Sequence, residues 1–273
     1  MRKEFNIEKA VEIGKTILDY FKKRKGVFSN IKIESRNDIG MDKEIYLNYI
    51  TFISSIDYAK GIEADVLWKE GKEWVKKYRW LFLPNELFQR SCKEVMETFL
   101  IIRKNSKKVF RLKDIGIWLT IASTLQEFEG KTSKLLERFK KGEVIDAKRV
   151  FEFIKDSKEK FPYLSGDKIL PMWIKILKED GGVEFKNMDK IPLPVDRNVA
   201  RVTYNLIFHE DFNGELSEKK KEEIREVWKE IANRIKVAVI EFDTPLWFLG
   251  GKYCSKRKCR ICSFKKYCRG NRV

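Results

Sequence analysis

Residues 161 to 201 read FPYLSGDKILPMWIKILKEDGGVEFKNMDKIPLPVDRNVAR, and this stretch decides how the rest of the chain is interpreted. A short polar hairpin leads into a helix that opens at Lys168. Ser165 is its predicted N-cap, because a serine hydroxyl can accept from a first-turn amide, and Pro171 is tolerated near a helix start. A second helix is predicted to begin after Asp196, which suits the N-cap position. The stretch therefore places a lysine and a carboxylate at two helix N-termini, 28 residues apart.

This pair of residues is suited to chemistry on a sugar. The positive end of the helix dipole disfavours an ammonium at Lys168 and so favours the neutral amine, which is the form that attacks C1′ of a sugar to give a Schiff base. A carboxylate at Asp196 is stabilised as the anion at a helix N-terminus and can stabilise positive charge that develops on the sugar. Lysines near helix starts and aspartate N-caps are also ordinary structural features, so the pair alone leaves a purely structural interpretation open.

The composition points to a polyanionic partner. The chain has 273 residues, with 58 Lys and Arg against 41 Asp and Glu, a net charge of +17. Such an excess favours nucleic acid. Proteins of thermophiles often carry many charged surface residues, which would explain the number of charges but not the excess of basic over acidic residues. No run of 18 apolar residues occurs, so no membrane helix is predicted, and the first residues lack the apolar core of a signal peptide. We expect a cytoplasmic protein.

Apolar periodicity predicts helices through most of the chain. Amphipathic patterns cover residues 5–25 and 218–240, an apolar stretch covers 43–60, and strand signals are scarce. The tryptophans at 68, 74 and 80 are interpreted as packing residues, and Cys92 is expected in the core. The predicted fold class is all-α.

Four of the five cysteines crowd the last twenty residues. Their spacing is C-x4-C-x2-C-x5-C, formed by Cys254, Cys259, Cys262 and Cys268. Four thiolates this close can hold a [4Fe–4S] cluster or a single Zn²⁺. From residue 252 onward there are nine Lys or Arg and no acidic residue, which makes the same loop a candidate anchor for a phosphate backbone.

Taken together, these segments resemble the helix-hairpin-helix DNA glycosylases. The catalytic half is most similar to the archaeal 8-oxoguanine DNA glycosylase family, through the words KILPMWIKIL (168–177), IPLPVDRNVARVTY (191–204) and EFDTPLWFLG (241–250), with a weaker match in SSIDYAKG (54–61). The cysteine loop looks like the iron–sulfur loop of the endonuclease III and adenine glycosylase branches. Those branches have six residues rather than four in the first gap between cysteines. The archaeal family typically lacks such a loop. The hairpin LSGDK also departs from the LPGVG type of the superfamily.

The resemblance implies a site and a mechanism. Lys168 falls at the family's Schiff-base lysine and Asp196 at its catalytic aspartate. Trp247 would contact the flipped base by stacking, and Asp243 would contact it by a hydrogen bond. Met172 occupies the position where the family has a second aromatic residue. Lys175 falls at a second lysine of the same helix face. The implied partner is double-stranded DNA that contains a damaged base, bound by a monomer.

The implied architecture has two helical subdomains with the cleft between them. We predict a helical barrel at residues 42–165, a second subdomain from residues 1–41 and 166–250, and a metal-binding loop at 251–273. The favoured function is a DNA glycosylase with AP lyase activity that removes 8-oxoguanine. Two alternatives stay open: a glycosylase of the same fold for an oxidised pyrimidine or a deaminated base, and a metal-containing DNA-binding protein without catalysis.

Overall fold

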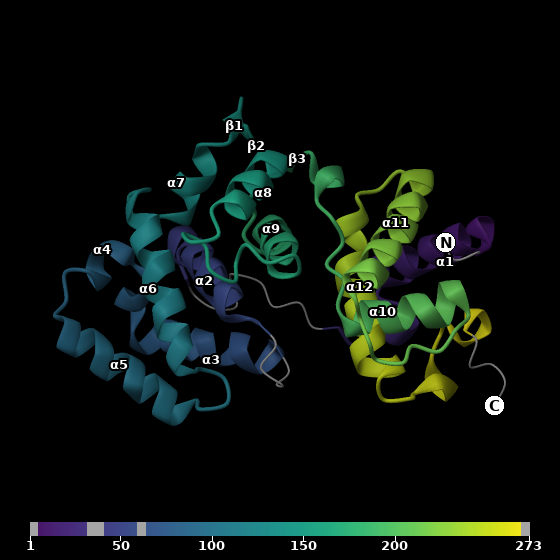
Figure 1. The fold of residues 1–273 in the computed structure, drawn as a ribbon, viewed down its shortest axis with the longest axis horizontal. Helices are drawn as coiled ribbons and strands as arrows, with labels where there is room; N and C mark the ends of the chain where they lie inside the picture. The colour runs from purple at the N-terminus through teal and green to yellow at the C-terminus, as the bar shows by residue number, and fades with distance from the viewer. Residues whose placement is uncertain (1–4, 32–40, 59–63, 269–273) are drawn as a thin grey trace. The chain divides into compact units, whose positions relative to one another are not determined.

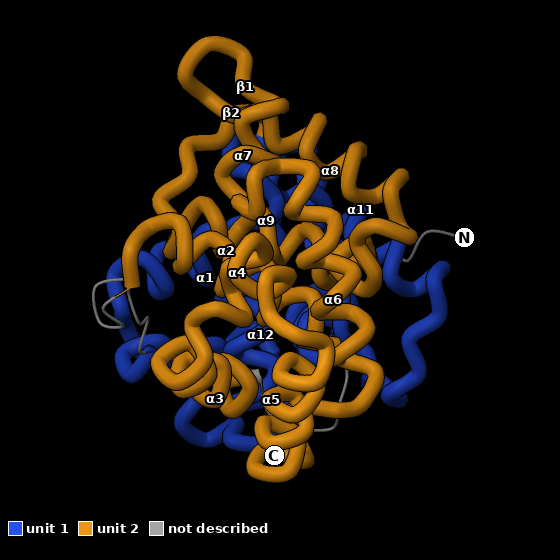
Figure 2. Tube along the Cα trace, turned by 90° about the vertical axis from the view of Figure 1, so that its left-hand side faces the viewer, with its two compact units in different colours: residues 1–33, 188–273 blue, residues 34–187 orange. Residues whose placement is uncertain are grey.

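The computed structural model describes residues 5–31, 41–58 and 64–268 (Figure 1). Helices dominate these residues, and their strands form one small three-stranded sheet. The predicted all-α fold class is thereby confirmed. The chain divides into two compact units, which we call unit 1 (residues 1–33 and 188–273) and unit 2 (residues 34–187) (Figure 2). Within the described residues, no helix is both long enough and apolar enough to span a membrane.

Unit 2 consists of helices and the small sheet. Its helices are α2 (Lys43–Ile56), α3 (Ala64–Lys77), a 3-10 helix (Arg79–Phe82), α4 (Pro84–Leu87), α5 (Cys92–Asn105), α6 (Leu112–Gln126), α7 (Thr132–Glu137), α8 (Ala147–Asp156) and α9 (Ile169–Glu179). In the sheet, β2 (Val144–Asp146) pairs antiparallel with β1 (Lys140–Lys141) and parallel with β3 (Phe185–Lys186).

Helix α2 lies at the centre of unit 2. Every residue from Ile45 to Ile56 is buried, as expected of a helix that is apolar on all sides. It packs against α3, α6, α7 and α9. The apolar stretch at 43–60 is therefore the core helix of this unit, although the described helix ends at Ile56.

Two polar side chains on α2 satisfy buried groups of neighbouring segments. The Asn48 amide nitrogen donates to the carbonyls of Phe82 (2.9 Å) and Gly130 (3.0 Å), and its oxygen accepts from the Thr132 amide (2.8 Å). The Thr51 hydroxyl accepts from the Trp173 indole (3.0 Å) and shares a hydrogen bond with the Thr132 hydroxyl (2.9 Å). Buried polar groups are costly when they lack partners, so these bonds fix the position of α9 and the start of α7 on α2.

Unit 1 is also helical. Its segments are α1 (Ile7–Lys22), a 3-10 helix (Gly26–Phe28), a 3-10 helix (Met188–Lys190), α10 (Arg197–Thr203) with its π-helical continuation (Tyr204–Phe208), α11 (Glu218–Ile235), a 3-10 helix (Val239–Phe242), α12 (Asp243–Phe248) with its π-helical continuation (Leu249–Cys254), and two 3-10 helices (Cys259–Ile261 and Lys265–Tyr267).

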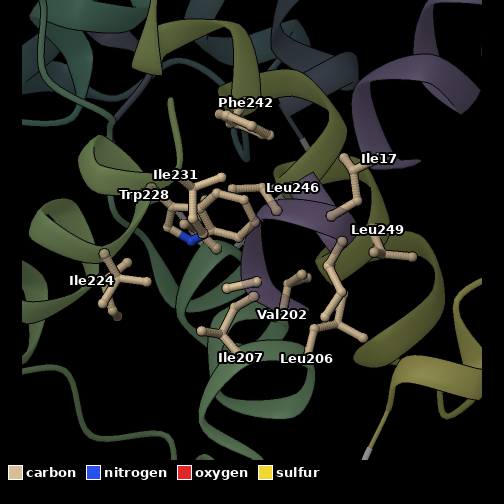
Figure 3. Close-up of a cluster of buried hydrophobic side chains, with 14 of the residues drawn as sticks. Ile17, Val202, Leu206, Ile207, Ile224, Trp228, Ile231, Phe242, Leu246 and Leu249 are labelled. Carbon is tan, nitrogen blue, oxygen red and sulfur yellow. The ribbon is translucent and has the colours of Figure 1, made fainter. Parts of the chain in front are cut away.

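The core of unit 1 gathers side chains from both ends of the chain (Figure 3). Helix α1 packs against α11, and Gly14 permits the contact, because a Cβ there would lie 2.6 Å from Ile231 Cγ2. The fully buried Trp228 donates its indole N–H to the Thr203 hydroxyl (2.8 Å). This bond ties α11 to the C-terminal end of α10.

Two boundaries differ from the prediction. Residues 166–187, assigned from the sequence to the second subdomain, belong to unit 2, because α9 packs on α2 and α8 and β3 pairs with β2. The helix predicted at 218–240 ends at Ile235, where Lys236 adopts a left-handed conformation with φ 58°. The predicted helix at 5–25 is confirmed in its main part and begins after an Asn6 N-cap. Part of the word SSIDYAKG lies outside the described residues.

The hydroxyl of Thr51 generates a stability prediction for unit 2. Thr51→Val removes the acceptor of the buried Trp173 N–H and should lower the free energy of unfolding by about 1–3 kcal/mol, as measured by urea denaturation. Ser54→Ala is the matched control on the same helix, because the buried Ser54 hydroxyl has no hydrogen-bond partner among the described residues. It should stay within about 1 kcal/mol of wild type or gain stability. Equal losses for the two variants would contradict the role of Thr51.

Candidate functional site

Lys168 immediately precedes α9 and is exposed. It occupies the N-cap position with α-helical backbone angles, and its side chain makes no capping bond. The prediction that Ser165 would cap this helix was wrong. A turn separates Ser165 from the helix, and the amide of Leu170 donates to the carbonyl of Gly166 (3.0 Å). The lysine therefore stands at the junction of the hairpin and the helix.

Side chains of unit 2 hold the hairpin that precedes Lys168. Phe161 and Leu164 are fully buried. Lys155 of α8 donates to the Ser165 carbonyl (3.3 Å) and forms an ion pair with Asp167. These contacts leave little freedom to the backbone that carries Lys168.

Helix α9 presents the other predicted residues of this segment. Met172 and Lys175 follow Lys168 at positions that share one helix face. Met172 is half-buried, and Lys175 is only 5% exposed and forms an ion pair with Glu179 (3.4 Å). At the end of the helix, burial raises the pKa of Asp180 to about 6, and the neighbouring Glu179 carboxylate adds to the increase. Lys175 thus lies among carboxylates at the C-terminal half of α9.

Asp196 caps α10 in unit 1, as predicted. Its Oδ1 atom accepts from the backbone amides of Asn198 (2.8 Å) and Val199 (3.0 Å). These two hydrogen bonds orient the Asp196 side chain at the start of α10. The side chain is half-buried.

Helix α12, which carries Asp243 and Trp247, packs directly against α10. Asp243 is its first residue, and both side chains are half-buried. In the π-helical continuation of α12, a Cβ at Gly250 would lie 2.3 Å from the Asn198 carbonyl oxygen. Only a residue without a side chain fits this contact. The structure thereby joins the words IPLPVDRNVARVTY and EFDTPLWFLG within unit 1.

The four C-terminal cysteines line one pocket of unit 1. The pocket is completed by Asn205, Leu206, Leu249, Tyr253, Lys258, Phe264 and Lys265. Burial raises the pKa of the Cys254 thiol to about 12, and the adjacent thiols of Cys262 and Cys268 add to the increase. Burial likewise raises the pKa of Cys262. Cys254, Cys262 and Cys268 are half-buried and Cys259 is exposed, and sulfur donors grouped in this way need a cation, or protons, to offset thiolate charge.

The residue type in this pocket is one that binds metals, because cysteine thiolates are ligands of zinc and of iron–sulfur clusters. Four thiols surround one pocket, and two lysines line it with them. Among the described residues, however, no three or more His, Cys, Asp or Glu side chains are arranged as direct ligands of one ion. The pocket groups all four cysteines that the sequence spacing had singled out. Asn205 was not predicted; its side chain hydrogen-bonds to Cys254, and no sequence spacing pointed to it.

The cysteine loop is built into the core of unit 1. Phe264 is fully buried and packs near Phe28 (5.9 Å between ring centroids). The Ser263 hydroxyl accepts from the Val27 amide (3.2 Å), and the Tyr267 hydroxyl donates to Glu12 (2.8 Å). A loop with these contacts to the N-terminal segment is not a separate module.

The remaining cysteine was placed incorrectly from the sequence. Cys92 is exposed rather than buried in the core. It is the first residue of α5, and this helix turns Val95, Thr98, Phe99 and Ile102 inward instead. Cys92 is not among the residues that line the cysteine pocket.

The candidate residues are distributed over both units. Unit 2 carries Lys168, Met172 and Lys175, whereas unit 1 carries Asp196, Asp243, Trp247 and the four cysteines. Within unit 1 the structure brings the helices of Asp196 and Trp247 into contact. Within unit 2 it places Lys168 at the exposed start of a helix whose Trp173 is fixed in the core.

Comparisons with known proteins give one family. Residues 167–273 match the family model described as AGOG, N-glycosylase/DNA lyase. The match begins at the residue before Lys168 and includes every predicted site residue. Searches of curated proteins and of solved structures gave no match.

Asp180 predicts a pH dependence of stability. The ordinary pKa of an aspartate carboxyl is 3.8, and in the fold the pKa of Asp180 is about 6, so the folded state binds its proton more tightly. This contribution to stability is present at low pH and is lost as the pH rises from about 4 to about 6. Asp180→Asn should therefore be more stable than wild type above pH 6, by at most about 3 kcal/mol, and similar to it below pH 4.

Urea denaturation from pH 4 to pH 8 measures this difference. Glu159→Gln, which changes an exposed carboxylate in the same unit, is the control and should follow wild type. If Asp180→Asn and wild type have the same free energy of unfolding at every pH, the raised pKa assigned to Asp180 is contradicted.

Proposed function

We propose that the chain is an N-glycosylase/DNA lyase in which Lys168 is the nucleophile, and the family match of residues 167–273 supports this activity. The chain is thus an enzyme of base-excision repair that acts on DNA. The observation that carries the proposal is the location of Lys168: an exposed lysine between a fixed hairpin and a helix, at the start of the matched region. A fixed backbone with an exposed amine is what attack on a sugar carbon requires.

The proposed reaction proceeds in two stages. The Lys168 amine attacks C1′ of the flipped nucleotide, the bond from C1′ to the base breaks, and the base leaves with the electron pair and takes up a proton. The attached nitrogen then loses a proton, the C1′–O4′ bond opens and O4′ takes up a proton, which leaves a protonated imine between Lys168 and C1′. Loss of a proton from C2′ finally expels the 3′ phosphate oxygen, and the strand is nicked.

Asp196 is proposed to stabilise the positive charge on the sugar. Its carboxylate is held by two backbone amides at the start of α10, so it is oriented before the substrate arrives. Preorganised charge of this kind needs no rearrangement during the reaction.

The proposed base contacts are Trp247, Asp243 and Met172, with 8-oxoguanine as the favoured base. Trp247 would stack on the flipped base and Asp243 would accept from an N–H on its edge. Met172 supplies a flexible thioether, where the resembling family has a second ring. This difference favours one alternative in particular, a glycosylase of the same fold for an oxidised pyrimidine or a deaminated base.

We further propose that the four pocket cysteines hold a [4Fe–4S] cluster, with a single Zn²⁺ as the alternative. Four cysteine ligands leave no open coordination position, so the centre would be structural. The surrounding loop carries Lys256, Arg257 and Lys258, all exposed, and is proposed to contact backbone phosphates.

Borohydride trapping tests the lysine chemistry. Wild-type protein should give a covalent adduct on duplexes that contain 8-oxoguanine or an abasic site. Lys168→Gln should reduce trapping and strand cleavage to background while it still binds the duplex. Lys178→Gln, an exposed lysine on the same helix, is the control and should retain both activities.

The choice of duplexes separates the competing functions. Duplexes with uracil, hypoxanthine or thymine glycol complete the series. An adduct with only one of these duplexes would change the proposed substrate base but retain Lys168 as the nucleophile. Absence of any adduct, including one with the abasic site, would overturn the nucleophile and leave a DNA-binding protein or a glycosylase that uses water.

Metal analysis tests the cysteine pocket. Protein purified without oxygen should contain iron and acid-labile sulfide, and Cys262→Ser should lose both together with a large part of its thermal stability. Cys92→Ser, which changes an exposed cysteine outside the pocket, should retain them. Zinc without sulfide would select the alternative, and protein that contains neither metal would refute a metal centre.

A further inference from the structure

An aromatic and basic cluster lies on unit 2 beside the hairpin. Its members are Tyr58 at the end of α2, Lys113 in the first turn of α6 and Tyr163 of the hairpin. The Tyr58 and Tyr163 rings lie 4.7 Å apart between centroids, at an interplanar angle of 32°. The Lys113 ammonium lies 3.8 Å from the Tyr58 centroid and 4.9 Å from the Tyr163 centroid. None of these residues belongs to the site described above.

Hydrogen bonds hold the side chains of the cluster in place. The Tyr58 hydroxyl donates to the fully buried Asp114 carboxylate (2.5 Å), which also accepts from the Arg111 amide (2.7 Å) at the start of α6. The Lys113 ammonium donates to the Tyr163 hydroxyl (3.2 Å). Tyr58 is therefore fixed by the helix cap, and it positions the other two side chains.

Tyr163 and Lys113 are exposed, whereas Tyr58 is half-buried. Tyr163 is 43% exposed, and it is one of seven large hydrophobic residues that are exposed among the described residues. Its φ is 60°, and the Leu164 amide donates to the Pro162 carbonyl (2.7 Å) around it. This is a three-residue turn of a rare and strained type. Strain of this kind persists where the surroundings enforce it, and it is concentrated at functional positions.

The chemistry of the cluster matches an extended nucleic-acid strand. An exposed aromatic ring can stack on any base, and a neighbouring ammonium can bind a phosphate. The net charge of +17 also favours a polyanionic partner. The hairpin that presents Tyr163 leads within five residues to Lys168, so a ring at this position would contact DNA close to the reacting nucleotide.

We propose that Tyr163 stacks on an unpaired base of the bound DNA and that Lys113 contacts a backbone phosphate next to it. This inference rests on the proposed function, because an unpaired base arises when the damaged nucleotide is flipped. It adds a DNA contact that neither the family match nor the sequence motifs assigned.

The test uses Tyr163→Gly and Tyr163→Phe in the full-length chain. Binding is measured to a duplex with a tetrahydrofuran abasic analogue, which the lysine cannot open. Tyr163→Gly removes the ring but suits the positive φ, so it should fold with unchanged or higher thermal stability. It should bind about 5- to 150-fold more weakly, the range that corresponds to stacking of one base. Tyr163→Phe keeps the ring and should bind like wild type.

Two control variants match the proposed contacts. Phe88→Ala removes an aromatic side chain of the same unit that is 44% exposed, and its binding should be unchanged. Lys113→Gln should lower the slope of log Kobs against log salt concentration by about 0.9, as expected for one lost phosphate contact. Lys107→Gln, another exposed lysine, should leave the slope unchanged.

A fluorescent base locates the stacked partner. With 2-aminopurine opposite the abasic analogue or next to it, wild-type protein should change the fluorescence at one of these positions, and Tyr163→Gly should abolish that change. Wild-type binding and fluorescence in Tyr163→Gly would overturn the proposal even if borohydride trapping of the wild type succeeds. Failure of trapping together with weakened Tyr163→Gly binding would overturn the lysine chemistry and leave the stacking contact supported.

Discussion

The hydrogen bond from the Trp173 indole to the buried Thr51 hydroxyl (3.0 Å) fixes the helix on which the proposed chemistry depends. Helix α2 is buried on all sides, and a helix in that position must satisfy every polar group that it carries. Thr51 and Asn48 do so by bonding to segments that surround α2. Since Lys168 precedes the same helix as Trp173, the position of its amine follows from the packing of α9 on α2.

Unit 1 uses the same device for the proposed carboxylate. The Trp228 indole donates to the buried Thr203 hydroxyl (2.8 Å) and so holds α10, the helix that Asp196 caps. Gly250 then allows α12 to approach the first turn of α10. In both units, a tryptophan supplies apolar area to the core and one N–H donor that needs a single specific partner. This combination fixes a helix more definitely than apolar packing alone, which tolerates rearrangement.

The cysteine loop and the tyrosine cluster show how the charged surface is supported by buried contacts. The loop is strongly basic, yet Phe264 and Tyr267 insert into the core of unit 1, so its lysines and arginines project from a fixed backbone. The cluster of Tyr58, Lys113 and Tyr163 rests on the buried carboxylate of Asp114. A cation held in this manner loses little conformational entropy when it meets a phosphate.

The sequence by itself determined the local features. Apolar periodicity established the all-α class, the residue type at Asp196 established a helix N-cap, and the spacing of four cysteines established that they gather, because each depends on residues close together in the chain. Only the tertiary structure decided the rest. It assigned α9 to unit 2 through Trp173 and Thr51, exposed Cys92, moved the N-cap of α9 from Ser165 to Lys168, and paired Tyr58 with Tyr163. These outcomes depend on which distant segments pack together, and local patterns do not encode that choice.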